Sequence, residues 1–93
     1  MEEIKMSGGH FDYNQYKITD IRDTIERIIK NNGKNVTEYE GYDFSDDTIS
    51  EFKQAVNLLR KAEIYVQRID WLVSGDDGED SFHQRLVEEL SEL

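Results

Sequence analysis

The stretch that decides the fold is SDDTISEFKQAVNLLRKAEIYVQRIDWLV, residues 45–73. Ser45 is a favourable N-cap residue, and Asp46 and Asp47 complement the positive end of the helix dipole. No proline or glycine interrupts the stretch, and Gly75 follows it as a stop signal. We therefore expect one helix over 46–73, roughly 40 Å long.

The apolar residues of this helix form two adjacent stripes at helical spacing. The first stripe contains Ile49, Phe52, Val56, Leu59, Val66 and Val73. The second stripe contains Ala55, Leu58, Ala62, Tyr65, Ile69 and Leu72. An apolar face of this width needs more than one packing neighbour.

Two shorter helices are expected beside the long one. Residues 15–31 carry isoleucines on one face, with Asp12 or Asn14 as the cap and Asn31-Asn32-Gly33 as the stop. Residues 80–91 carry Phe82, Leu86 and Leu90 on one face, with Asp77 or Asp80 as the cap. The expected fold is therefore a small all-α, three-helix protein with a long central helix. We take 1–93 as a single domain with a flexible leader over 1–6.

The two shorter helices can cover the long helix only if they share it end to end. Otherwise the long helix pairs with a copy of itself, because uncovered apolar stripes commonly form interfaces. We therefore expect a homo-oligomer.

Composition restricts the classes of protein to which the chain can belong. The 93 residues include no cysteine, so disulfides and thiolate metal sites are excluded. No apolar run approaches the roughly 20 residues of a membrane span, and the acidic start lacks a signal region. We expect a cytoplasmic protein with no membrane partner.

The net charge of −10 is unevenly distributed along the chain. Residues 38–51 hold six carboxylates and no cation, and residues 76–93 hold seven carboxylates and one cation. Residues 17–34 and 53–71 each sum to about +2. Direct binding to nucleic acid over a broad surface is not expected, because phosphates would be repelled. A basic protein partner or a local basic pocket remains compatible with this distribution.

One strip of the long helix combines cations with an aromatic ring. At three- and four-residue steps it presents Asn57, Lys61, Ile64, Arg68 and Trp71. Cations beside an indole can bind a phosphate while a base stacks on the ring. We therefore take Lys61, Arg68 and Trp71 as candidate ligand-binding residues. The alternative is a solvated face, with Trp71 and Tyr65 turned into the core.

A second candidate segment precedes the first helix. Gly8 and Gly9 let the backbone approach a ligand or form an anion-binding nest. His10 can add a hydrogen bond, and the neighbouring stacking faces are Phe11, Tyr13 and Tyr16. The alternative is a loose start whose aromatic residues plug the core.

No pattern in the chain predicts a reaction. The acidic segment over 74–80 does not match the spacing of a calcium-binding loop. Its glycines and aspartates are typical of a turn between two helices. His10 and His83 lie far apart and lack a spaced ligand cluster or a nucleophile motif. We expect no catalytic residues, no metal and no cofactor, and hence no enzyme.

The segments MSGGHFDYNQY, residues 6–16, and QRIDWLVSGDDG, residues 67–78, are distinctive together. They resemble a family of small uncharacterised proteins encoded by phages and prophages. The resemblance covers most of the chain from Met6 and is weakest over 31–46. It implies a viral or prophage source and the host cytoplasm, but it brings no activity.

Two functions follow as expectations. The first is an accessory protein that counteracts host immunity by binding and sequestering a nucleotide signal, in the manner of a sponge. The second is an acidic DNA mimic that binds a host nuclease or another nucleic-acid-binding defence protein. The first needs the Arg68–Trp71 surface, whereas the second needs the acidic loop and tail.

Overall fold

The computed structural model describes residues 11, 13–34 and 41–93, and all regular structure in this part of the chain is helical. Helix α1 spans Tyr16–Asn31, α2 spans Asp46–Val73 and α3 spans Glu79–Ser91. The predicted all-α class with a long central helix is confirmed. The predicted bounds of the three helices agree with the observed ones to within one residue.

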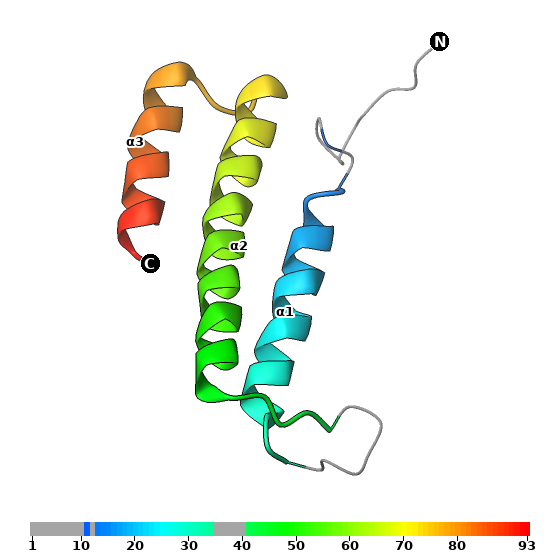
Figure 1. Ribbon diagram of the computed structural model, residues 1–93. Helices are drawn as coiled ribbons and strands as arrows, with labels where there is room; N and C mark the ends of the chain where they lie inside the picture. The colour runs from blue at the N-terminus through cyan, green and yellow to red at the C-terminus, as the bar shows by residue number, and fades with distance from the viewer. Residues whose placement is uncertain (1–10, 12, 35–40) are drawn as a thin grey trace.

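The three helices lie side by side in a single layer, with α2 in the middle (Figure 1). The backbone extends over 50 × 34 × 14 Å along its principal axes, so it is much thinner in one direction than in the other two. Both α1 and α3 pack against α2, but they do not pack against each other. The end-to-end arrangement is therefore wrong: α1 runs along α2 on one flank, and α3 lies along the C-terminal part of its other flank (Figure 1).

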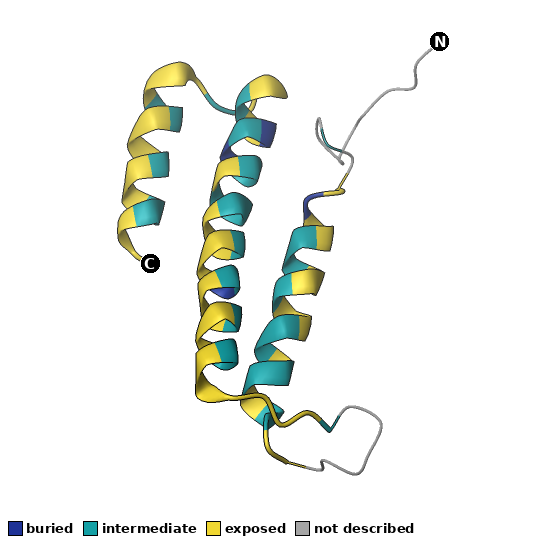
Figure 2. Ribbon diagram, in the orientation of Figure 1, coloured by how far each residue is buried: buried dark blue, intermediate teal, exposed yellow. Residues whose placement is uncertain are grey.

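The seam between α1 and α2 combines ion pairs with a thin apolar contact. Arg22 Nε donates to Glu63 Oε2 at 2.6 Å, and Arg60 Nη2 donates to Glu26 Oε2 at 2.7 Å. Among the described residues, Val56 is the single apolar residue in the buried class. Figure 2 shows the same distribution: the turns of α2 are covered toward α1 and exposed away from it. A single layer cannot enclose a core, because each helix has neighbours only on its flanks.

The connection between α1 and α2 is closed by hydrogen bonds on both sides of residues 35–40. The Asn32 side chain donates to the Phe44 carbonyl at 3.0 Å and accepts from the Phe44 N–H at 2.8 Å. The Gly33 N–H donates to the Tyr42 carbonyl at 2.7 Å, from a backbone with φ of +82° that favours glycine. The Phe44 ring then stacks on Tyr42 and tilts against Phe52. These contacts orient α2 antiparallel to α1.

The helix caps follow the sequence in part. Ser45 caps α2 as predicted, since its Oγ accepts from the Thr48 N–H at 3.3 Å. The expected Asn14 cap is wrong, because Gln15 occupies the N-cap position of α1 without a side-chain bond; Asp12 lies outside the described residues.

At α3 the expected caps Asp77 and Asp80 are also wrong, because Gly78 occupies the N-cap position. The Gly78 N–H donates to Ser81 Oγ at 3.2 Å. Asp77 stays before the helix, and its carboxylate accepts from both Gly78 and Ser81. Gly75 ends the preceding turn with φ of +86°, as the sequence indicates.

No helix in the described part of the chain combines the length and apolar character needed to cross a membrane.

The cap of α2 gives the first prediction. We expect Ser45→Ala to lower the free energy of unfolding by about 1 kcal/mol, because a backbone N–H at the start of α2 loses its acceptor. Chemical denaturation followed by circular dichroism measures the change. The matched control is Ser50→Ala on an exposed turn inside α2, where alanine is the better helix former. Equal stability of the two variants would contradict the capping role.

Candidate functional site

The C-terminal turns of α2 hold a buried cation, Arg68, which is 4% exposed. Its Nη1 lies 3.7 Å from Asp77 Oδ2, and its Nε lies 3.3 Å from Glu89 Oε1. Its guanidinium carbon lies 4.2 Å from the centroid of the Trp71 ring. Arg68 therefore ties α2 both to the turn before α3 and to α3 itself.

The contacts of Arg68 are ion pairs without full hydrogen-bond geometry. Arg68 Nε and Nη1 and Asp77 Oδ2 are buried and lack hydrogen-bond partners. The other oxygen of Asp77 accepts from Ser81, which fixes the orientation of the carboxylate. The sequence predicts Arg68 as a ligand-binding residue, whereas the structure places its charge between two internal carboxylates. An external phosphate would have to compete with both of them.

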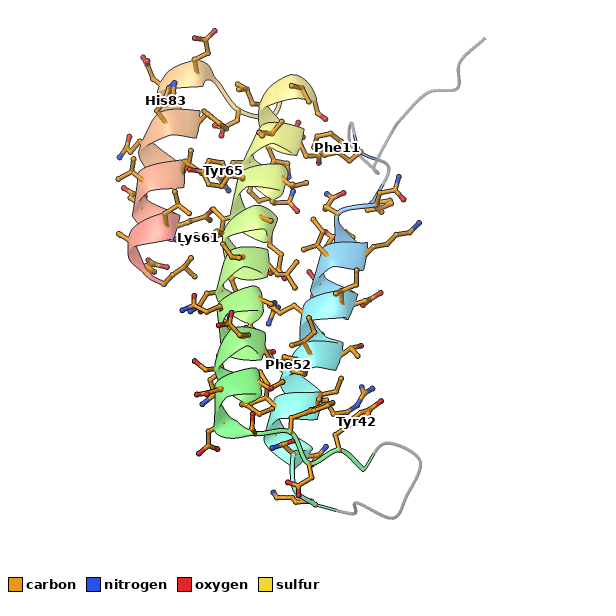
Figure 3. The ribbon with its side chains drawn as sticks, viewed as in Figure 1. Phe11, Tyr42, Phe52, Lys61, Tyr65 and His83 are labelled. Carbon is orange, nitrogen blue, oxygen red and sulfur yellow. The ribbon has the colours of Figure 1, made fainter. Side chains whose placement is uncertain are left out.

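Next to Arg68, Asp70 connects α2 to the segment before α1. Asp70 is 3% exposed, and its Oδ1 accepts from the Phe11 N–H at 3.0 Å. One turn away, the buried Gln15 donates from Nε2 to Gln67 Oε1 at 3.4 Å. Figure 3 shows Phe11 beside the C-terminal end of α2. The two distinctive segments of the sequence therefore do meet, through Asp70 and Gln67.

The predicted site residues are brought together only in part. Tyr13 and Tyr16 stack with ring centroids 6.0 Å apart, and both rings are exposed. Tyr13 has a positive φ of 68°, an uncommon conformation for a residue other than glycine. Gly8, Gly9 and His10 lie outside the described residues.

Lys61 lies apart from Arg68 and from the residues around it, Trp71, Asp77 and Glu89, which we call the Arg68 cluster. It is exposed on α2, seven residues before Arg68 and about 10 Å along the helix axis from it. In Figure 3 it lies beside the C-terminal end of α3.

A groove elsewhere on the surface has a size that suits a small ligand. A groove of about 600 Å³ lies between α1, α2 and the residues that follow α3. Its lining includes Glu26, Ile29, Lys30, Lys53, Val56, Asn57, Arg60, Glu92 and Leu93. Val56 and Ile29 provide an apolar floor, and the polar lining consists of three cations, two carboxylates and one amide. The volume lies within the range of small-molecule sites.

The three cations that line the groove differ in whether a carboxylate pairs with them. Arg60 pairs with Glu26, whereas no carboxylate of the described residues pairs with Lys30 or Lys53. The hydrogen bond from Arg60 lowers the pKa of Glu26, so this carboxylate stays ionised at neutral pH. The hydrogen bond to Glu63 raises the pKa of Arg22, which remains charged. The two lysines are the cations left available to an anionic ligand.

Among the described residues, no group of three or more histidine, aspartate or glutamate side chains is placed to hold an ion. His83 is exposed on α3, with its ring against the edge of Phe82 at 5.2 Å.

Searches of protein-family models, curated proteins and solved structures found no match to the chain. The resemblance to phage and prophage proteins therefore stays a prediction.

None of the residues predicted to bind a ligand lines this groove. The strip of the long helix already contained Asn57, and Lys53 and Arg60 lie beside it at helical spacing. Lys30 and Ile29 belong to another helix, so only the α1–α2 packing brings them to the same place. The buried Asp70 was also missed, because its partner is a backbone N–H that no pattern of side chains reveals.

The Arg68 cluster gives the second prediction. We expect Arg68→Ala to lower the free energy of unfolding by about 3 kcal/mol, because Asp77 would remain buried without its counter-charge. The matched control is Arg85→Ala, which removes an exposed cation from α3. That control should change stability by less than about 0.5 kcal/mol. If both variants unfold like the native chain, Arg68 is not the link between α2 and α3.

Proposed function

We propose that this chain is a non-enzymatic binding protein that holds a nucleotide in the groove between α1 and α2. The proposal rests on two cations, Lys30 and Lys53, that have no carboxylate partner among the described residues. They lie beside an apolar floor on a chain whose net charge is −10. A phosphate can pair with the lysines, while a base can cover Val56 and Ile29 and hydrogen-bond to the Asn57 amide.

Binding is favoured over catalysis by the chemistry of the lining. The described residues around the groove supply cations, an amide and carboxylates, but no imidazole, hydroxyl or thiol. Histidine, serine, threonine and cysteine are common catalytic groups. Carboxylates and lysines can also act in catalysis, but Glu26 is held in an ion pair with Arg60.

The resemblance to phage and prophage proteins directs the proposal toward host immunity. A small protein that binds a nucleotide without converting it can sequester a signal made by the host. In this role the chain acts in the host cytoplasm, and its efficacy depends on affinity and on the number of copies made.

The groove gives the third prediction. Calorimetric titration with linear and cyclic nucleotides should detect binding, and Lys53→Gln should weaken it roughly tenfold through loss of a charge-assisted contact. The matched control is Lys61→Gln, an exposed lysine of α2 outside the groove lining, which should bind like the native chain.

The outcomes of this experiment are distinct. If a folded sample shows neither heat of binding nor a shift in melting temperature with any nucleotide, the chain does not bind nucleotides. Weakening by Lys61→Gln with no effect of Lys53→Gln would instead place the ligand on the strip of Lys61, Arg68 and Trp71.

A second candidate function is supported by the exposed carboxylates at the ends of α2. Asp46, Asp47 and Glu51 are exposed at its start, and Asp76 and Asp80 are exposed at the turn into α3. These groups can imitate DNA phosphates toward a basic surface of a host nuclease or another defence protein. Asp77 and Glu89 contribute less, because they already face Arg68.

The acidic mimic gives the fourth prediction. If the chain inhibits a host nuclease, the triple variant D46N/D47N/E51Q should lose most of the inhibition, and added salt should weaken the native complex. The Lys53→Gln variant, which alters the groove, should inhibit like the native chain. Inhibition that survives neutralisation of these carboxylates would rule out this surface as the mimic.

A further inference from the structure

The groove between α1 and α2 adjoins two further hollows along α2. One, of about 440 Å³, is lined by residues that include Thr19, Ile64 and Gln67. The other, of about 490 Å³, is lined by Arg68 and by residues of α3. The C-terminal end of α3 lies beside the middle of α2 (Figure 1), and Glu92, which follows α3, lines all three hollows.

The other carboxylates that line these hollows already have internal partners. Glu26 accepts from Arg22 at 3.1 Å through one oxygen and from Arg60 at 2.7 Å through the other. The remaining three have one partner each: Glu63 accepts from Arg22, Glu88 accepts from Gln84, and Glu89 pairs with Arg68. The Glu92 carboxylate has no hydrogen-bond or ion-pair partner among the described residues. It is therefore the lining carboxylate that is available to a ligand.

Glu92 is also poorly placed for the stability of α3. It is the C-cap residue of this helix, and the last turn of α3 contains no basic residue. A carboxylate at this position faces the negative end of the helix dipole, which is unfavourable. Local preference and position therefore disagree at Glu92, and such a disagreement is typical of residues that serve a binding site.

The unpartnered charges of the groove have both signs. Lys30 and Lys53 are cations without a carboxylate partner, and Glu92 is an anion without a cationic partner. A ligand that uses all three needs a phosphate for the lysines and N–H donors for Glu92, because an ionised carboxylate only accepts hydrogen bonds. A ligand that is anionic throughout would be repelled by Glu92, and one that is cationic throughout would be repelled by the lysines.

Among the nucleobases, guanine has the edge that fits a carboxylate. Its N1–H and N2–H donors lie side by side, so both carboxylate oxygens can accept at once. Adenine presents its N6–H beside the N1 lone pair, and cytosine presents its N4–H beside the N3 lone pair. In uracil the N3–H lies between two carbonyl oxygens. With these three bases the second carboxylate oxygen would face another acceptor, so the Watson–Crick edge distinguishes them from guanine.

We propose that Glu92 makes the groove selective for guanine nucleotides, by accepting hydrogen bonds from the N1–H and N2–H of the base. This inference rests on the nucleotide site proposed above and names its substrate class. The phosphate pairs with Lys30 and Lys53, and the base covers the apolar floor with its Watson–Crick edge toward Glu92.

Calorimetric titration of the full chain with GMP, IMP and AMP tests the contact with the base. The three nucleotides carry the same ribose and phosphate, so the contribution of the lysines cancels when their affinities are compared. GMP should bind at least about tenfold more tightly than AMP, because a bidentate pair discriminates against the wrong base. IMP lacks the N2 amino group and one of the two hydrogen bonds, so its affinity should lie between the other two.

The variant Glu92→Gln keeps the size of the side chain and changes what it can bind. An amide offers one acceptor and one donor side by side, which matches the N6–H and N1 of adenine and not the two donors of guanine. The preference for GMP over AMP should therefore disappear or reverse. The matched control is Glu88→Gln, which removes the same charge one turn earlier on α3, outside the groove lining, and should keep the native preference.

The outcomes separate this inference from the proposed nucleotide site. If none of the three nucleotides binds to the folded chain, the inference is overturned together with the site for these ligands. If they bind with equal affinity, or if Glu92→Gln keeps the preference for GMP, nucleotide binding stands and the role of Glu92 is wrong. Equal loss of the preference in Glu92→Gln and Glu88→Gln would also overturn it, because the charge of α3 would then set the preference.

Discussion

The structure depends on how the central helix α2 is supported. Its neighbours α1 and α3 lie on its two flanks and do not contact each other, so the chain forms one layer. A single layer gives each helix contacts along its sides and leaves both broad faces open. The thin apolar seam around Val56 and the reliance on ion pairs such as Arg22–Glu63 follow from this constraint.

Within that layer the cations have two different roles: one stabilises the contact between helices, and two line the groove. Arg68 is buried against Trp71 and between Asp77 and Glu89, where it joins α2 to α3. Lys30 and Lys53 lie beside the groove without a carboxylate partner among the described residues. A buried cation with internal counter-charges stabilises a fold, whereas an exposed cation beside a hollow is available to a ligand. This difference moves the proposed nucleotide site from Arg68 toward the α1–α2 groove.

The groove lies on one side of the layer, between α1, α2 and the residues that follow α3. It combines charge with a concave surface, which favours a small anionic ligand.

The sequence by itself determined the helices. Ser45 marks the start of α2, and Gly33 and Gly75 mark the ends of α1 and α2. The spacing of apolar residues along α2 shows that it needs several neighbours. These features are local, because capping bonds and helical periodicity act within a few residues. The sequence also identified the segments containing Phe11 and Trp71 as unusual, and they do adjoin through Asp70.

Only the tertiary structure decided which side chains share a place. Arg68 pairs with Glu89, and Arg60 pairs with Glu26, although each pair is 20 or more positions apart in the sequence. Lys30 and Lys53, also more than 20 positions apart, line the same groove. Periodicity gives the face of each helix, but it does not give the flank on which a neighbour packs. That choice assigned Arg68 to the interior and formed a groove on one face of α2.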